Sequence, residues 1–134
     1  MPKNLQKHKY GARQTCIDGH KFASALEASL YGHLKILESA KEISQIQLQP
    51  NVQLSICCCC NLKRRMIPDF KVFDEKLNQP VYYEAKGVET DRWLDNVKLW
   101  KVHGPGRLLV FKGTYRRLFL SEEIIPKFSA AGLA

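Results

Sequence analysis

The sequence predicts a fold of the α/β or α+β class, in which a central mixed sheet is flanked by helices. Three observations predict it: a capping signal that opens a run of leucines at helical spacing, a stretch of alternating apolar and polar residues, and a second helical stripe followed by a short apolar segment. The 134 residues suffice for one domain with the element order helix, three strands, helix, strand.

A small hairpin and a helix come first in this order. Asp18-Gly19 is a dipeptide that favours the type I′ turn of a two-residue hairpin. Ser24 and Glu27 have the spacing of a capping box, and leucines follow at helical spacing. Together these signals predict a hairpin and then a helix that ends near Ala40.

A three-stranded meander is expected next. Residues 46–56 alternate between apolar and polar side chains, and Pro50 implies a bend or an edge position within that strand. The cysteine run and Asn61 make a turn, a second strand covers residues 64–74, and the segment VYYEAK forms the third strand.

A second helix and a buried strand complete the predicted core. Thr90 or Asp91 caps the helix, and residues 103–106 end it. The segment RLLVFKG then forms a short buried strand, and TYRRLFLSEEIIPKF adds a final strand or short helix. The apolar stripe of the helix consists of Trp93, Leu94, Val97 and Trp100.

Composition predicts a reduced, cytoplasmic protein that does not enter a membrane. No apolar run approaches the roughly 18 to 20 residues of a membrane span, and the N-terminal residues lack the apolar region of a secretory signal. Four of the five cysteines stand together at Cys57–Cys60, which is a poor disulfide framework. Neighbouring strand residues point to opposite faces, which disfavours one tetrahedral zinc site, so we expect a reduced hairpin or strand end.

The second and third strands bring two carboxylates together. If Asp74 pairs with Gln79 around a four-residue loop, Asp69 lies directly opposite Glu84. Facing carboxylates repel unless a cation lies between them, and such a pair of oxygens suits Mg²⁺. Lys86 shares their face, and the alternative for all three is a set of cross-strand ion pairs on a solvated surface. The opposite face carries the expected core residues: Met66, Phe70, Val72, Val81, Tyr83 and Ala85.

Five motifs occur in a fixed order between roughly residues 9 and 112: Asp18-Gly19, Phe22-Ala23-Ser24-Ala25-Leu26-Glu27-Ala28, Leu48-Gln49-Pro50, Pro68-Asp69-Phe70 and Glu84-Ala85-Lys86-Gly87. This series resembles the PD-(D/E)XK nuclease superfamily, and more closely a group of small, often phage-encoded endonucleases within it. The resemblance implies a restriction-endonuclease-like core with the order α-β-β-β-α-β.

The resemblance also implies Mg²⁺-dependent hydrolysis of phosphodiester bonds, with Mn²⁺ able to substitute. Asp69, Glu84 and the backbone carbonyl of Ala85 would hold the metal. Lys86 would position or deprotonate the attacking water and stabilise charge on the phosphate, roles that agree with metal-assisted hydrolysis in general. Glu27 matches a helix glutamate that completes the site in many members, while its place in the capping box offers a purely structural role.

The charge balance favours nucleic acid as the partner. The chain has 21 Lys and Arg against 13 Asp and Glu, a formal net charge of +8. A basic arm of residues 1–13 precedes a domain of residues 14–134, and phosphate contacts of this kind supply affinity without sequence information. The candidates are Lys3, Lys7, Lys9, Arg13, Lys63, Arg64, Arg65, Arg116 and Arg117.

Four further candidate contacts depend on the resemblance or on the helix pattern. Gln49, Thr90 and Lys98 match positions of related sequences, and Lys101 lies with Lys98 off the apolar stripe. For each of them, a solvated strand or helix face is the alternative interpretation.

Three classes of function stay open at this point. The leading one is a structure-selective, phage-encoded DNA endonuclease of the bacterial host cytosol, serving recombination, replication or genome processing beside phage replication, recombination or packaging proteins. A Holliday-junction resolvase is its specific form and implies a homodimer, because two symmetric cuts need two sites. The others are a nucleic-acid-binding module without cleavage and a metal or redox protein built on Cys57–Cys60.

Overall fold

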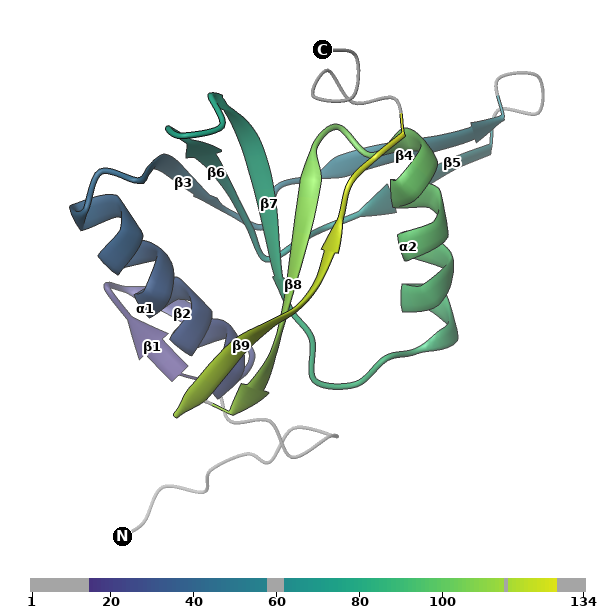
Figure 1. Cartoon of the computed structure of the whole chain (residues 1–134). Helices are drawn as coiled ribbons and strands as arrows, with labels where there is room; N and C mark the ends of the chain where they lie inside the picture. The colour runs from purple at the N-terminus through teal and green to yellow at the C-terminus, as the bar shows by residue number, and fades with distance from the viewer. Residues whose placement is uncertain (1–14, 58–61, 115, 128–134) are drawn as a thin grey trace, which may run out of the picture.

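The computed structural model describes residues 15–57, 62–114 and 116–127, and it shows a five-stranded mixed sheet between two helices (Figure 1). The strand order is β3-β6-β7-β8-β9, in which β7 and β8 are parallel and all other neighbours are antiparallel. The predicted fold class is confirmed. The predicted basic arm with Lys3, Lys7, Lys9 and Arg13 lies outside the described residues, as do Cys58–Cys60.

Nine strands and two helices occur within the described ranges. In chain order they are β1 (Thr15–Ile17), β2 (His20–Phe22), α1 (Ala25–Ser39), β3 (Ile43–Leu48), β4 (Val52–Cys57), β5 (Leu62–Met66), β6 (Phe70–Asp74), β7 (Gln79–Ala85), α2 (Asp91–His103), β8 (Arg107–Thr114) and β9 (Arg117–Ile124).

The N-terminal elements form as the sequence predicts. Asp18 and Gly19 both have positive φ angles, 51° and 78°, which is the backbone of the type I′ turn that joins β1 to β2. The Ser24 hydroxyl accepts a hydrogen bond of 3.1 Å from the Glu27 N–H, so Ser24 is the N-cap of α1. The helix ends at the C-cap residue Ala40.

The middle of the chain is one long hairpin with a bend in each arm. Strand β3 pairs with β6, and β4 pairs with β5 in a separate two-stranded sheet. The single strands expected over residues 46–56 and 64–74 are therefore wrong, since each is two strands. Pro50 and Pro68 stand at the two breaks, where their missing N–H groups interrupt strand pairing.

Both faces of the central sheet are covered, so the fold has three layers. One face packs on α1 through Phe70, Val72, Val81, Tyr83 and Phe111. The other face packs on α2 and the β4–β5 hairpin, which therefore lie across the sheet from α1 (Figure 1). Met66 belongs to this second layer with Tyr82, and not to the Phe70 face as expected, because the bend at Pro68 turns β5 away from β6.

Helix α2 and the strands after it agree with their predictions except at Leu94, which was expected on the apolar stripe and is 46% exposed, because Asn96 takes that place on the buried face. The Thr90 hydroxyl accepts from the Trp93 N–H at 3.1 Å and caps the helix. The fully buried Trp100 indole donates a 2.8 Å hydrogen bond to the carbonyl of Gly106, which fixes the chain as it enters β8. Neither of the two described helices has the length and hydropathy needed to cross a lipid bilayer.

Candidate active site

The predicted pairing of Asp69 with Glu84 is confirmed by the register of the β6–β7 hairpin. Asp74 pairs with Gln79, and the same register continues to Phe70 and Tyr83. One residue further on, two hydrogen bonds join the segment before β6 to the end of β7. The Asp69 N–H donates to Glu84 Oε2 at 3.0 Å, and the Ala85 N–H donates to Asp69 Oδ2 at 2.8 Å. Each carboxylate is thus held by the backbone of the other strand.

The site stands where several elements end together. Because β7 and β8 are parallel and Ala85 pairs with Phe111, the C-terminal ends of both strands lie at the same end of the sheet. The N-termini of α1 and α2 also lie toward this end (Figure 1). Helix N-termini carry partial positive charge, so this end of the sheet favours the binding of anionic ligands.

Burial makes the two carboxylates hard to ionise. Glu84 is only 9% exposed, which contradicts a solvated face for this residue. Burial, followed by repulsion from Glu27, raises the pKa of Asp69 to about 7. Burial, followed by repulsion from Asp69, raises the pKa of Glu84 to about 8. A cation between them would offset this repulsion and favour both charged forms.

Glu27 lies in the first turn of α1 and also lies near Asp69 and Glu84. It is 8% exposed, and its carboxylate accepts a hydrogen bond from the Ala23 N–H at the start of α1. Burial raises its pKa above the ordinary value. Because its charge also raises the pKa of Asp69 and Glu84, Glu27 is within electrostatic reach of both.

Lys86 contributes the positive charge of the site. Its backbone N–H donates to the Phe111 carbonyl at 2.9 Å, and its ammonium lies 4.7 Å from the centroid of the Trp93 ring. This cation–π contact holds the side chain against α2. The Lys86 charge lowers the pKa of Asp69 and of Glu84, although no ion pair joins it to either carboxylate within the described residues.

The donor set fits a hard divalent cation. Mg²⁺ prefers oxygen ligands and is usually held by one or two carboxylates, with water and phosphate oxygens completing the octahedron. Asp69 and Glu84 are two such carboxylates, and the backbone of Ala85, which follows Glu84 in the sequence, donates its N–H to Asp69 Oδ2. In the described part of the chain, no three His, Cys, Asp or Glu side chains are arranged to enclose a metal by themselves.

A cavity of about 300 Å³ opens beside these residues. Glu84 and Lys86 line it on the sheet side, and Arg65, Thr90, Arg92, Trp93 and Asn96 are among its other lining residues. Positive charge therefore dominates the space next to the carboxylates.

The predicted nucleic-acid contacts fall into two groups. Those near the carboxylates include Gln49, which is exposed and whose N–H donates to the Asp69 carbonyl at 2.8 Å, and Arg65, which lines the same cavity as Glu84. Lys63 and Arg64 precede Arg65 on β5 and are not in the lining of that cavity. Thr90 serves as the α2 cap. Lys98 and Lys101 are exposed further along α2, and the exposed Arg116 and Arg117 follow the end of β8.

A family of proteins of unknown function, DUF1064, matches residues 7–121. The chain belongs to this family. A search of curated proteins finds no match. A DUF1064 protein carries no assigned activity by its family alone, so its function has to be argued from the site itself.

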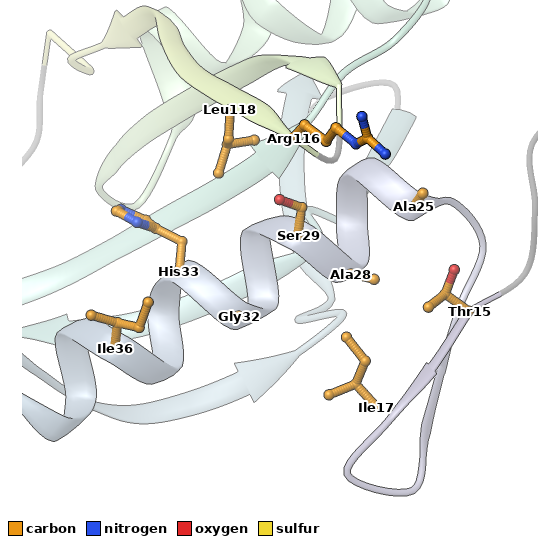
Figure 2. Close-up of a pocket in the computed structure, with 10 residues that line it drawn as sticks. All are labelled: Thr15, Ile17, Ala25, Ala28, Ser29, Gly32, His33, Ile36, Arg116 and Leu118. Atoms are coloured by element: carbon orange, nitrogen blue, oxygen red, sulfur yellow. The ribbon is translucent and has the colours of Figure 1, made fainter.

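A second and larger cavity lies away from the carboxylates. It measures about 880 Å³ and lies between α1, β1 and the start of β9, with Ile36, His33 and Leu118 in its walls (Figure 2). Its lining is mostly apolar and contains none of Asp69, Glu84 and Lys86. The size of a cavity thus does not identify the site in this DUF1064 protein.

Three α2 residues that line the smaller cavity had not been predicted as functional: Arg92, Trp93 and Asn96. Trp93 was expected to be a core residue, and it is buried, but its ring also contacts Lys86. Asn96 carried a signal in the sequence. With Trp93, Val97 and Trp100 it has the spacing of one helix face, so it is a polar residue within an otherwise apolar stripe.

Proposed function

We propose that this protein is a divalent-metal-dependent DNA endonuclease that hydrolyses phosphodiester bonds. One observation carries the proposal: the carboxylates of Asp69 and Glu84 face each other, each accepts a hydrogen bond from the backbone of the opposite segment, and Glu84 and Lys86 line a cationic cavity beside them. Facing carboxylates with a nearby lysine are the groups that metal-assisted hydrolysis of a phosphate ester needs.

The residues have distinct roles in this proposal. Asp69 and Glu84, with the Ala85 carbonyl, would hold Mg²⁺ or Mn²⁺, which lowers the pKa of bound water and polarises the phosphoryl oxygen. The Lys86 ammonium would stabilise the negative charge that develops on the phosphate and orient the attacking water. Glu27 would add its charge to the same cluster, and the buried surroundings keep bulk water away from the pair.

Weak sequence selectivity follows from the kinds of residue around the site. Lysine and arginine side chains such as Lys63 and Arg65 contact phosphates, and phosphate contacts carry no base information. We therefore propose an enzyme that selects its substrate by DNA structure and serves phage recombination, replication or genome processing.

Cleavage assays with and without Mg²⁺ test the proposal. The substrates are linear duplex, nicked duplex, splayed-arm, four-way junction and single-stranded DNA. Asp69→Asn and Glu84→Gln should lower kcat by about a hundredfold or more, since loss of a metal ligand removes several kcal/mol of transition-state stabilisation. Glu122→Gln, an exposed carboxylate on β9, is the matched control and should cut normally.

The pattern of cutting decides among the forms of the proposal. Symmetric incision of the junction alone would identify a resolvase and imply a dimer. Cutting of all duplexes would identify a general nuclease that depends on another component for its target. Binding of DNA without cleavage in either Mg²⁺ or Mn²⁺ would overturn the enzyme proposal in favour of a nucleic-acid-binding module.

A further inference from the structure

Asn96 is a buried polar side chain whose amide oxygen has no hydrogen-bond partner among the residues that the structure describes. The residue is 8% exposed, and its Oδ1 is buried and accepts no hydrogen bond within the described residues. A buried polar atom without a partner destabilises the fold, and an apolar residue at this point of the helix face would avoid that loss. Its neighbours Val97 and Trp100 on the same face pack in the apolar core. The amide therefore has a reason other than stability to be there.

The amide lines the cavity that reaches the candidate active site. Asn96 shares the 300 Å³ space with Glu84 and Lys86, and it lies one helical turn beyond Trp93, whose ring contacts the Lys86 ammonium. A ligand in this space would thus lie beside Asn96 as well as beside the Glu84 carboxylate and the Lys86 ammonium.

The charges around the cavity select an anionic ligand. Arg65 at the end of β5, Arg92 in the first turn of α2 and Lys86 provide three cations against the single carboxylate of Glu84. The N-terminal turn of α2 adds its partial positive charge on the same side. Arginine is the side chain best suited to the planar, two-pronged binding of phosphate.

A phosphate alone does not explain the amide. Oδ1 is an acceptor and needs an N–H or O–H donor, which a phosphodiester lacks and a nucleobase has on its polar edge. Trp93, Met66 and Ile67 also line the cavity and supply apolar contacts for a base. We infer that this cavity binds one unstacked nucleotide next to the scissile phosphate, with its phosphate on Arg65 and Arg92 and its base edge on Asn96.

The inference rests on the proposed nuclease function and adds a substrate class to it. A base inside a duplex cannot reach a buried amide, because its polar edge is paired and stacked. The preferred substrates are therefore those with an unpaired nucleotide beside the cut.

Asn96→Leu provides the first test, on two substrates that differ only in the base of that nucleotide. One carries an unpaired base beside the cleaved bond and the other an abasic residue there. The variant should raise KM about threefold to tenfold on the first substrate and leave KM on the second unchanged. It should also raise the melting temperature, because it removes an unpaired buried amide.

Val97→Ala is the matched control, since Val97 lies beside Asn96 on the buried face but does not line the cavity. It should lower the melting temperature and leave the ratio of the two KM values unchanged. If Asn96→Leu affects both substrates equally, or lowers the melting temperature without changing KM, Asn96 is structural and the inference is wrong.

A binding experiment separates this inference from the proposed cleavage. A single-stranded tetranucleotide is titrated into the protein while the side-chain amide resonances of Asn96 are followed by NMR. Shifted resonances, with weaker binding by Asn96→Leu, would support the nucleotide site even in a protein that never cuts DNA. Unmoved resonances in a protein that does cut would overturn the nucleotide site and leave the nuclease intact.

Discussion

Asp69 and Glu84 affect the stability of the fold in two opposite ways. Their hydrogen bonds to Ala85 N–H and Asp69 N–H tie the ends of the two strands together. Their burial beside Glu27 works against folding, because three carboxylates repel one another where little water screens them. Natural sites often retain such unfavourable groups because function requires them.

The stability of the metal-free protein should fall as the pH rises from about 4 to about 8. The pKa values of Asp69, about 7, and Glu84, about 8, lie above those of the unfolded chain, near 4. The stabilising contribution of the protonated pair is thus fully present below about pH 4 and is lost as the pH rises through 7 and 8. Thermal unfolding in EDTA across this range measures the loss.

Mg²⁺ should reverse that loss, because it binds the ionised pair in the folded state only. The gain in melting temperature on adding Mg²⁺ should therefore grow between pH 5 and about pH 8. Asp69→Asn removes one of the charges and should flatten both the pH dependence and the Mg²⁺ effect. A wild-type Mg²⁺ effect that does not change with pH would contradict a metal site at this pair.

The residue pairing was predictable, whereas the surroundings of the pair were not. Strand periodicity and a four-residue turn after Asp74 suffice to bring Asp69 opposite Glu84. The contact between Lys86 and Trp93, by contrast, joins β7 to a helix face, and the geometry of that contact depends on how the helix packs. The sequence marks Asn96 as unusual, but only the packing brings it into the same cavity as Lys86.

At the level of whole elements, the bend in the long hairpin creates the site. The alternation of residues 46–56 and 64–74 looks continuous because the side-chain period is kept across each break. Gln49, with a φ angle of 49°, and Pro68 redirect the two arms, so that β4 and β5 join the α2 layer. Sequence periodicity cannot predict such a bend, since both halves of each arm remain strands.

The cap of α2 provides a test of how this helix supports the site. Thr90→Ala should destabilise the protein by about 1 kcal/mol, because the Trp93 N–H loses its hydrogen-bond acceptor. The loosened first turn carries Trp93, so the positioning of Lys86 and the cleavage rate should decline with it. Chemical denaturation and kcat are the two measurements.

Thr90→Ser distinguishes the cap from a DNA contact. Serine keeps the hydroxyl acceptor and should restore most of the stability and the rate. If Thr90→Ala instead weakens DNA binding at unchanged stability, the hydroxyl contacts DNA and the effect on the helix is minor.

For the molecule as a whole, the candidate site and the N-termini of both helices lie at one end of the central sheet. The net charge of +8 is a property of the full chain, but the C-terminal ends of β7 and β8 and the start of both helices gather at the edge that holds the carboxylates. The β6–β7 turn with Lys76 lies at the other end of the same strands. Basic residues at the two ends should therefore contribute unequally to DNA binding.

Lys98 and Lys76 form a matched pair for this difference, since both are exposed lysines outside the cavity. If Lys98 on α2 contacts a phosphate, Lys98→Ala should reduce the slope of log K against log salt by about 0.9, the counterion release expected for one contact. Lys76→Ala should leave the slope unchanged. Filter or fluorescence binding at four salt concentrations measures both slopes. Equal slopes in the two variants would mean that Lys98 lies on a solvated helix face. DNA would then approach the carboxylates from the side of β5, the strand that carries Lys63 and Arg65.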